Sequence, residues 1–356
     1  MQTRIAIFLT ALIAGGFPAS AQAALDRPPQ FVVFSFDNCT ELERWQELSD
    51  FLDEMNKTGD RVHFTFFVSG INYLTNEKKN AYQAPGHGRG VSNINFGGSP
   101  EDVKRRIGFI NALKVSGNDI GSHAVGHFDG RGWSAADWAQ EFRSYGDFFN
   151  NVTTINGFPD SVKLVFPLGE VVGFRAPYLS RSPGLYDALR NNRFRYDASG
   201  TGNANDWPQQ IGGIWRFNLA SLKVAGSGKY TLSMDYNFLI AKSGVAPNPK
   251  NQELYREQML RTYIQYFKSN YAGNRAPIHI GHHFFGHQGG VYNQALKAFA
   301  RMVCGLPEVR CATYSKLADF MDEINPATLY GFQIGDFPHA AEPALDPANA
   351  FARERR

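Results

Sequence analysis

Two histidines lie four residues apart, at His123 and His127. Imidazoles at this spacing can bind one metal ion if the chain turns helically between them, and an Asp or Asn side chain can add an oxygen ligand. Asp37 and Asn38 are the nearest candidates for that oxygen. The residue after His123 is Ala124, where zinc peptidases carry a glutamate. The pattern therefore indicates a metal site, and the missing glutamate argues against peptidase chemistry.

Polar and titratable residues recur where predicted strands end. They are Asp37 and Asn38 after the first strand, His123 after the third, Arg175 after the fourth, Asp197 after the fifth, and His282 and His283 after the seventh. A parallel β/α barrel carries its active site at the carboxyl ends of its strands. We therefore expect these side chains to meet in one site, where a metal-activated water molecule performs hydrolysis.

The elements that must position these residues alternate between short β-rich runs and amphipathic helical stretches from about residue 31 to 325. Such alternation is typical of parallel strands joined by helices. The predicted strands span residues 31–36, 62–69, 119–122, 171–174, 194–197, 214–217, 278–282 and 310–313. Eight strands favour an α/β barrel over an open wound sheet.

The sequence predicts helix starts at two serines. Ser99 and Ser134 are typical N-cap residues, and each is followed by a first turn that contains at least one acidic residue. Two segments, 72–98 and 201–213, are rich in glycine, asparagine and other polar residues, so we expect long loops there. From residue 326 the apolar periodicity fades, and we expect a loosely held tail.

The N-terminus resembles a secretory signal peptide. Arg4 supplies the positive charge, residues 5–16 form a short apolar run, and Ala21 and Ala23 fit a cleavage site. We expect cleavage after Ala23 and export to the periplasm or the extracellular space. The apolar run is too short to span a membrane, and no later segment is a candidate span.

The domain organisation follows from these boundaries. We predict a signal peptide at 1–23, one catalytic barrel at 28–325 and a C-terminal extension at 326–356. The formal net charge of +3 is small and the basic residues form no long run, so we expect neither nucleic acid nor a membrane surface as a partner.

The chain has three cysteines, at 39, 304 and 311. In an oxidising compartment Cys304 and Cys311, seven positions apart, are reasonable partners for a local disulfide. Cys39 is then unpaired, and we expect it to be a small buried residue rather than a ligand or nucleophile.

Five segments, taken in order, resemble the motifs of the polysaccharide deacetylases, carbohydrate esterase family four. They are residues 34–38, 122–127, 173–178, 196–197 with 206–207, and 278–283. The segment Asn274-Arg275-Ala276-Pro277 further resembles the chitin-deacetylase-like branch. The resemblance covers most of the mature chain and implies a distorted parallel (β/α) barrel of seven to eight strands. It also implies a metal-dependent hydrolase that removes acetyl groups from a polysaccharide containing N-acetylglucosamine, resembling chitin or peptidoglycan.

The resemblance assigns the reacting groups. Asp37 matches the family's catalytic base, and His123 and His127 match its metal-binding histidines. His283 matches the family's acid, which protonates the leaving amine, and His282 is the alternative. The family's second aspartate, a metal ligand, is replaced here by Asn38.

Other matched residues would position these groups or the substrate. Arg175 matches the residue that orients the base, and the backbone N–H of Tyr178 matches the donor to the oxyanion. Asp197 would hold Arg175, tune His283, or form a plain structural ion pair. Trp207 and Ile280 would wall the acetyl-methyl pocket or pack in the core.

Because Asn38 replaces an aspartate, the sequence allows more than one metal and more than one function. Its amide oxygen can still coordinate, so we expect a divalent metal, zinc by default with cobalt, nickel or manganese as alternatives, bound more loosely than by an aspartate. One rival function is an inactive relative that binds carbohydrate without cleaving it. Another is a barrel glycosidase, which would need two acids flanking a sugar bond. The partner in each case is a polysaccharide or oligosaccharide, and the sequence does not select which polymer or which oligomeric state.

Overall fold

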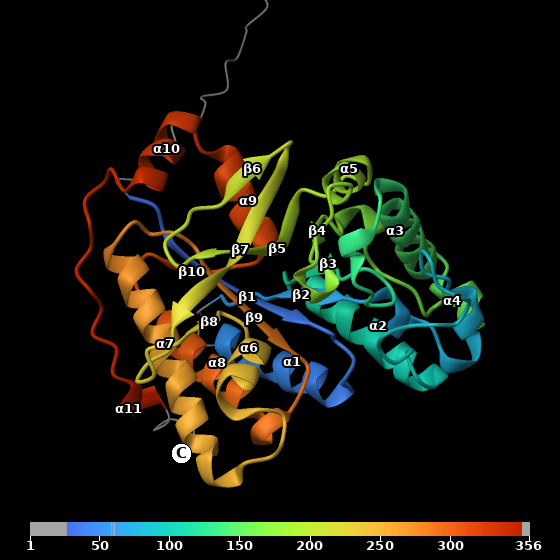
Figure 1. Ribbon diagram of the computed structural model, residues 1–356, viewed down its shortest axis with the longest axis horizontal. Helices are drawn as coiled ribbons and strands as arrows, with labels where there is room; N and C mark the ends of the chain where they lie inside the picture. The colour runs from blue at the N-terminus through green and yellow to red at the C-terminus, as the bar shows by residue number, and fades with distance from the viewer. Residues whose placement is uncertain (1–26, 58, 60, 351–356) are drawn as a thin grey trace, which may run out of the picture.

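A computed structural model describes residues 27–57, 59 and 61–350, and the predicted signal peptide lies outside them. Its ten strands form one mixed sheet (Figure 1). They are β1 (Gln30–Asp37), β2 (Thr65–Val68), β3 (Asp119–Ser122), β4 (Gly173–Phe174), β5 (Tyr196–Asn203), β6 (Gln209–Ile211), β7 (Ile214–Lys223), β8 (Tyr230–Leu232), β9 (Ile278–His283) and β10 (Val309–Cys311).

Strand β1 pairs with three other strands. All eight of its residues are buried, as expected for a parallel strand covered on both faces. It pairs in parallel with β10 along its first residues, with β9 along most of its length and with β2 near its end. The parallel order then continues through β3, β4, β5 and β7. Asp37, the last residue of β1, is thereby placed among the ends of several strands.

The ring of strands closes through a short connection and not through a continuous ladder. Between β7 and β9 lies Ser233, whose N–H donates to Ala220 O at 2.8 Å and whose carbonyl accepts from Gly281 N at 2.9 Å. Met234 forms an isolated parallel bridge with Gly281. The structure thus confirms the α/β class and a distorted, mostly parallel barrel.

Helices cover the outside of this sheet, with α2 and α3 on one side and α7 and α8 on the other (Figure 1). The α-helices are α1 (Leu42–Lys57), α2 (Pro100–Val115), α3 (Ala135–Asn150), α4 (Val152–Asn156), α5 (Leu185–Asn191), α6 (Asp235–Phe238), α7 (Gln252–Ala272), α8 (Val291–Val303), α9 (Tyr314–Glu323), α10 (Pro326–Ile334) and α11 (Pro347–Ala350). Ser99 and Ser134 cap α2 and α3 with complete capping boxes, which confirms both predicted helix starts.

The predicted loop at 201–213 is wrong in part, because strands occupy both of its ends. Strand β5 continues to Asn203, and β6 pairs antiparallel with β7 through a tight turn at Gly212 and Gly213. Both glycines have positive φ, 56° and 81°, which a two-residue hairpin turn requires. Strand β6 is short and exposed, and two of its three residues are glutamines, so no hydrophobic alternation predicts it.

The C-terminal segment is held more firmly than expected. Helix α10 buries Phe332, whose ring lies 6.5 Å from that of Trp207.

The predicted loop at 72–98 is confirmed as mostly irregular, with two short 3-10 turns, Gly70–Tyr73 and Asn76–Ala81.

Cys304 and Cys311 form a disulfide that ties the end of α8 to β10, and Cys39 is free and buried, both as predicted. Over the described residues, no helix combines the length and apolar character needed to cross a membrane.

Candidate active site

A cavity of about 460 Å³ opens at the carboxyl ends of β1, β3 and β9. It brings together six residues predicted for the site: Asp37, Asn38, His123, His127, Tyr178 and His283. The remaining wall is formed by Ala176, Leu179, Met234, Tyr236, Asn237 and Phe285. The strand-end positions therefore converge on one cavity.

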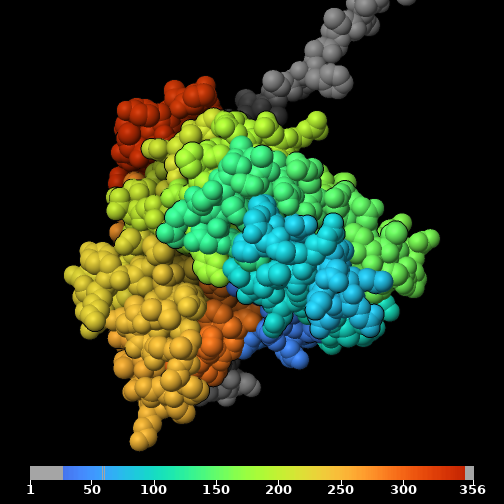
Figure 2. All heavy atoms as spheres, turned by 45° about the vertical axis from the view of Figure 1, so that its right-hand side comes forward, coloured from blue at the N-terminus to red at the C-terminus, as the bar shows by residue number. Residues whose placement is uncertain are grey.

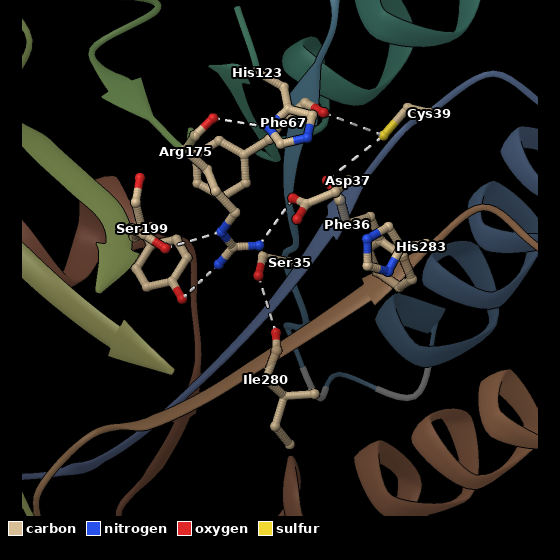
Figure 3. A network of polar contacts seen from close by, with 12 residues as sticks. Ser35, Phe36, Asp37, Cys39, Phe67, His123, Arg175, Ser199, Ile280 and His283 are labelled. Carbon is tan, nitrogen blue, oxygen red and sulfur yellow. Dashed lines mark hydrogen bonds and ion pairs between the residues drawn. The ribbon is translucent and has the colours of Figure 1, made fainter. Parts of the chain in front are cut away.

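Asp37 is a buried carboxylate paired with a buried guanidinium. Its Oδ1 lies 2.9 Å from Arg175 Nη1, and both side chains are almost inaccessible to solvent (Figure 3). Burial alone raises the pKa of Asp37, but Arg175, with smaller contributions from His123 and His283, outweighs it and holds the pKa below its usual value. Asp37 is therefore ionised at neutral pH and can accept a proton.

Arg175 is fixed by four contacts. Besides Asp37, it donates from Nε to Ala198 O at 3.0 Å and from Nη2 to Tyr314 Oη at 3.2 Å. Its guanidinium lies 4.5 Å from the centroid of the Phe67 ring, in cation–π contact. A planar group held at this many points fixes the orientation of the Asp37 carboxylate.

The two histidines lie on one tight loop after β3. Their ring centroids are 5.0 Å apart, and His123 Nδ1 lies 2.7 Å from the carbonyl of Arg175. That contact makes Nδ1 the donor and leaves Nε2 as the free ring nitrogen of His123. Burial lowers the pKa of His123, and burial together with His123 lowers the pKa of His127 to about 3. Both imidazoles are neutral at pH 7, the form that binds metals.

A buried glutamate holds the same loop from behind. Glu141 on α3 accepts the backbone N–H groups of Val125 and Gly126 on Oε1, at 2.9 and 3.1 Å. The hydroxyl of Tyr82 donates to the same carboxylate at 3.0 Å. Ala124 and His127 both have positive φ, near 56°, which is uncommon for residues other than glycine. The Glu141 contacts stabilise this strained loop. Sequence reasoning missed them because nothing in the sequence of α3 shows that one of its carboxylates turns inward to the histidine loop.

The side chains fit a metal ion through two unsatisfied atoms. Asn38 Oδ1 and His127 Nδ1 are buried and have no hydrogen-bond partner among the described residues. Asn38 itself is held at a φ of 48° beside Asp37. In the described part of the chain no three His, Cys, Asp or Glu side chains are arranged to hold a metal ion. The set that faces this cavity is instead two imidazoles and an amide oxygen.

His283 and His282 point to opposite sides of β9. His283 lines the cavity, and its Nδ1 and backbone N lie 2.7 and 2.8 Å from the two oxygens of Asp235. Burial lowers the pKa of His283, but Asp235 outweighs burial and raises it. His282 is fully buried between Tyr263 and Asn293. The geometry favours His283 over His282 as a proton donor to a bound molecule.

Asp235 is a site residue that sequence reasoning missed. It follows the connection that closes the barrel and begins the four-residue helix α6. No strand or motif signal precedes it in the sequence, and only the closure at Met234 brings it beside β9.

Asp197 does not have the predicted partners. Its carboxylate accepts from Tyr186 Oη at 2.9 Å and from the backbone N–H and hydroxyl of Ser199. Arg175 contacts Asp37, Ala198 and Tyr314 instead, and the partner of His283 is Asp235. A bulge after Asp197 carries β5 on past it, so Asp197 lies near the start of the strand and not at its end. Its influence on the site is indirect, because the Ser199 hydroxyl accepts from Ala176 N at 2.7 Å.

Trp207 and Ile280 belong to the core and not to the cavity wall. Trp207 donates from Nε1 to Asn274 O at 2.9 Å and packs against Phe332. Ile280 is fully buried on β9 in the main hydrophobic cluster. The apolar wall is made by Leu179, Met234 and Phe285.

Tyr178 lies at the mouth of the cavity. Its backbone has a φ of 57°, and no described residue accepts a hydrogen bond from its N–H. The residue is 59% exposed, and its ring centroid lies 4.8 Å from that of His127. Tyr236 is also exposed, and its ring lies 6.0 Å from His283. Two aromatic faces thus border the opening.

Comparison with solved structures shows the fold. A protein from Mycobacterium smegmatis, provisionally named a polysaccharide deacetylase, matches 89% of this chain and 96% of its own length with a TM-score of 0.51 and 16% identity. This chain has the fold of the polysaccharide deacetylases.

Two further matches are weaker. The Xyl-CE4 domain of a multidomain xylanase, from the hindgut metagenome of Trinervitermes trinervoides, covers 84% of this chain and 94% of that one, with a TM-score of 0.42 and 14% identity. A pseudoenzyme of the CE4 family from Bacillus anthracis covers 82% and 66%, with a TM-score of 0.42 and 11% identity. No family model matches this sequence. No curated protein matches it either.

Proposed function

We propose that this protein is a metal-dependent hydrolase that removes acetyl groups from a polysaccharide containing N-acetylglucosamine. The observation that supports this most is the content of one cavity. It combines an ionised carboxylate held by a buried arginine, two neutral imidazoles beside an unsatisfied amide oxygen, and a histidine paired with an aspartate.

We propose Asn38, His123 and His127 as the ligands of a divalent cation, with zinc as the default for a site with two imidazoles. When bound, such a cation supplies a water molecule of lowered pKa and polarises the acetyl carbonyl. The amide of Asn38 brings less negative charge than a carboxylate would. The affinity for the metal should therefore be lower than that of a site with an aspartate at this position.

Asp37 would accept the proton of the attacking water. Its depressed pKa keeps it ionised at neutral pH, and Arg175 fixes its direction. As the water oxygen bonds to the acetyl carbon, negative charge develops on the carbonyl oxygen. The free N–H of Tyr178, at the cavity mouth, would donate a hydrogen bond to that oxygen.

His283 would donate a proton to the leaving nitrogen. Its raised pKa keeps more of it protonated near neutral pH, and Asp235 holds the ring by Nδ1 so that Nε2 is the nitrogen left for transfer. The carbon–nitrogen bond then breaks, the sugar keeps a free amine, and acetate leaves.

The substrate class is supported by the walls of the cavity. Leu179, Met234 and Phe285 offer an apolar surface for an acetyl methyl group, and the exposed rings of Tyr178 and Tyr236 offer faces on which sugar rings can stack. We also propose that the protein is exported, since the predicted signal peptide and the disulfide suit an oxidising compartment.

Acetate release from N-acetylglucosamine oligomers, measured together with chain length, tests the proposal. We expect acetate with no shortening of the chain, and loss of activity in Asp37→Asn with the exposed Asp160→Asn as the matched control. Chain shortening without acetate would show a glycosidase and contradict the proposal.

A second candidate is glycan binding without hydrolysis, which Asn38 favours because it removes one charged ligand. Retained affinity for the oligomers, with no metal bound and no acetate released, would support that alternative.

A further inference from the structure

Asp197 and Ser199 are buried polar residues that the proposed mechanism does not use. Both lie on β5, on either side of the start of its bulge. The sequence predicts that Asp197 holds Arg175, tunes His283 or forms an ion pair, and the structure gives it neither of those two residues as a partner. Burying a carboxylate costs free energy unless hydrogen bonds replace its water. The bonds that Asp197 does form therefore indicate what it supports.

The carboxylate of Asp197 is held by uncharged donors. Its Oδ2 accepts from Tyr186 Oη at 2.9 Å, and its Oδ1 accepts from Ser199 N at 3.0 Å and from the Ser199 hydroxyl. Tyr186 lies on α5, which packs against α3. Figure 2 shows a continuous surface where the green atoms of this part of the chain meet the yellow-green ones. The negative charge of Asp197 is therefore enclosed, and no donor to it brings a compensating positive charge.

Ser199 links Asp197 to the segment that follows β4. Its hydroxyl donates to Asp197, and the same oxygen accepts from Ala176 N at 2.7 Å. A hydroxyl that donates to a carboxylate becomes a stronger acceptor, because the donated bond increases the negative charge on its oxygen. The distance to Ala176 N is at the short end of the range for N–H···O bonds, as expected for such an acceptor.

The same peptide unit contacts a proposed metal ligand on its other side. The N–H of Ala176 and the carbonyl of Arg175 belong to one peptide group, and that carbonyl lies 2.7 Å from His123 Nδ1 (Figure 3). A peptide group whose N–H is bonded to a strong acceptor has a more negative carbonyl oxygen. A continuous chain of hydrogen bonds therefore runs from Asp197 through Ser199 and this peptide group to His123.

This chain has the arrangement that supports metal-binding histidines in proteins. Such a histidine donates its second ring N–H to a carboxylate or a carbonyl, which fixes the ring and makes the other nitrogen a stronger ligand. In this protein the direct partner of His123 is a carbonyl, and the carboxylate of Asp197 acts on that carbonyl through Ser199. The support is needed because Asn38, the proposed oxygen ligand, brings no negative charge to a cation.

We propose that Asp197 and Ser199 are positioning residues that orient His123 and strengthen it as a metal ligand through the Arg175–Ala176 peptide group. The proposal rests on the proposed function, in which His123 binds a divalent cation. It adds two residues that act from behind the cavity wall at Ala176.

Zinc affinity, measured without substrate by competition with a chelator, tests the proposal. Ser199→Ala removes the hydroxyl from the chain, and we expect the affinity to fall by about tenfold. Asp197→Asn keeps an oxygen that accepts from Ser199 but removes the charge, so the affinity should fall by about threefold. The matched control is Tyr186→Phe, which removes the other hydroxyl bonded to Asp197 and leaves the chain intact. It should not lower the affinity.

A proton resonance gives a second measurement that needs neither metal nor activity. The buried Nδ1–H of His123 donates a short hydrogen bond, so in the metal-free protein it should give a slowly exchanging signal far downfield in the NMR spectrum. A weaker acceptor at the Arg175 carbonyl should move this signal upfield in Ser199→Ala and in Asp197→Asn. The signal should stay in place in Tyr186→Phe.

The outcomes separate this proposal from the proposed function. Zinc affinity equal to that of the wild type in Ser199→Ala, or an unmoved His123 signal, would overturn the positioning proposal even if the variant were less stable. If Ser199→Ala does not fold, Asp197→Asn takes its place in both measurements. A wild-type protein that binds zinc but releases no acetate from any oligomer would overturn the proposed function, and the zinc affinities and the His123 signal would then test the positioning proposal alone.

Discussion

Glu141 provides the sharpest test of how the histidine loop is held. Its buried carboxylate accepts two backbone N–H groups of the loop that carries His123 and His127, and it accepts the Tyr82 hydroxyl as well. Glu141→Ala would leave both N–H groups buried without a partner. We predict that this substitution weakens both the fold and the metal site.

The magnitude follows from the number of lost contacts. An unpaired buried donor costs about 1 to 3 kcal/mol, so two of them reduce the free energy of unfolding by about 4 kcal/mol. Loosening the support behind metal ligands typically reduces metal affinity by about 10- to 100-fold. Glu141→Gln keeps an oxygen that can accept both N–H groups, so it should lower the free energy of unfolding by less than about 1.5 kcal/mol.

The assay is urea unfolding of the metal-free protein together with zinc affinity from competition with a chelator. The partly exposed Glu257→Ala on α7 is the matched control and should change stability by less than about 0.5 kcal/mol. A Glu141→Ala variant with wild-type zinc affinity would refute the reasoning, even if the variant were less stable.

The same residue predicts a pH dependence. Burial raises the pKa of Glu141 above its ordinary value of 4.5, despite the hydrogen bonds that lower it. The folded state therefore binds more protons than the unfolded state, and stability falls as the pH rises from 4.5 through the higher folded pKa. The side chain introduced by Glu141→Gln does not titrate, so the stability of this variant does not fall in that pH range. The free energy of unfolding of the wild type should therefore exceed that of Glu141→Gln by more at pH 4.5 than at pH 7. An equal difference at both pH values would contradict this.

Three further substitutions have defined outcomes. Asp235→Asn removes the charge that raises the pKa of His283, so the basic limb of the kcat/KM profile should move down by about 1 to 2 pH units, and an unmoved limb would contradict the acid role. Trp207→Phe removes one hydrogen bond, so it should lower the free energy of unfolding in urea by about 1 kcal/mol and leave acetate release unchanged. A fall in acetate release would show that Trp207 contributes to the site. Replacing Cys304 and Cys311 by serine should lower the free energy of unfolding by about 2.5 kcal/mol from the short loop alone, and no change would show that the bond does not form in solution.

The strands of the barrel could be predicted from the sequence because their signals are local. The predicted strand at 119–122 matches β3 fully, and the one at 31–36 lies within β1. Strands β6 and β8 could not be predicted, since they are short, exposed or half-buried, and exist through pairing with β7. Helix α10 was likewise hidden, because the surface it packs on is assembled from distant segments.

The site could be predicted where its residues end strands. Asp37, His123 and His283 meet in one cavity because the barrel brings strand ends together. Asp197 shows the limit of that reasoning, since a bulge lets its strand run on and turns the carboxylate toward Tyr186. Asp235 could not be found at all, because its place beside His283 depends on a tertiary bridge at Met234.

The central claim is that Asn38, His123 and His127 hold a divalent cation that the hydrolysis requires. The most direct measurement is a titration of chelator-treated protein with zinc, following bound metal and acetate release from N-acetylglucosamine oligomers together, in the wild type and in His123→Ala. We predict that acetate release in the wild type rises with the first equivalent of zinc, and that the variant neither binds at that affinity nor releases acetate. Acetate release that is unaffected by chelation, or that persists in His123→Ala, would contradict the account.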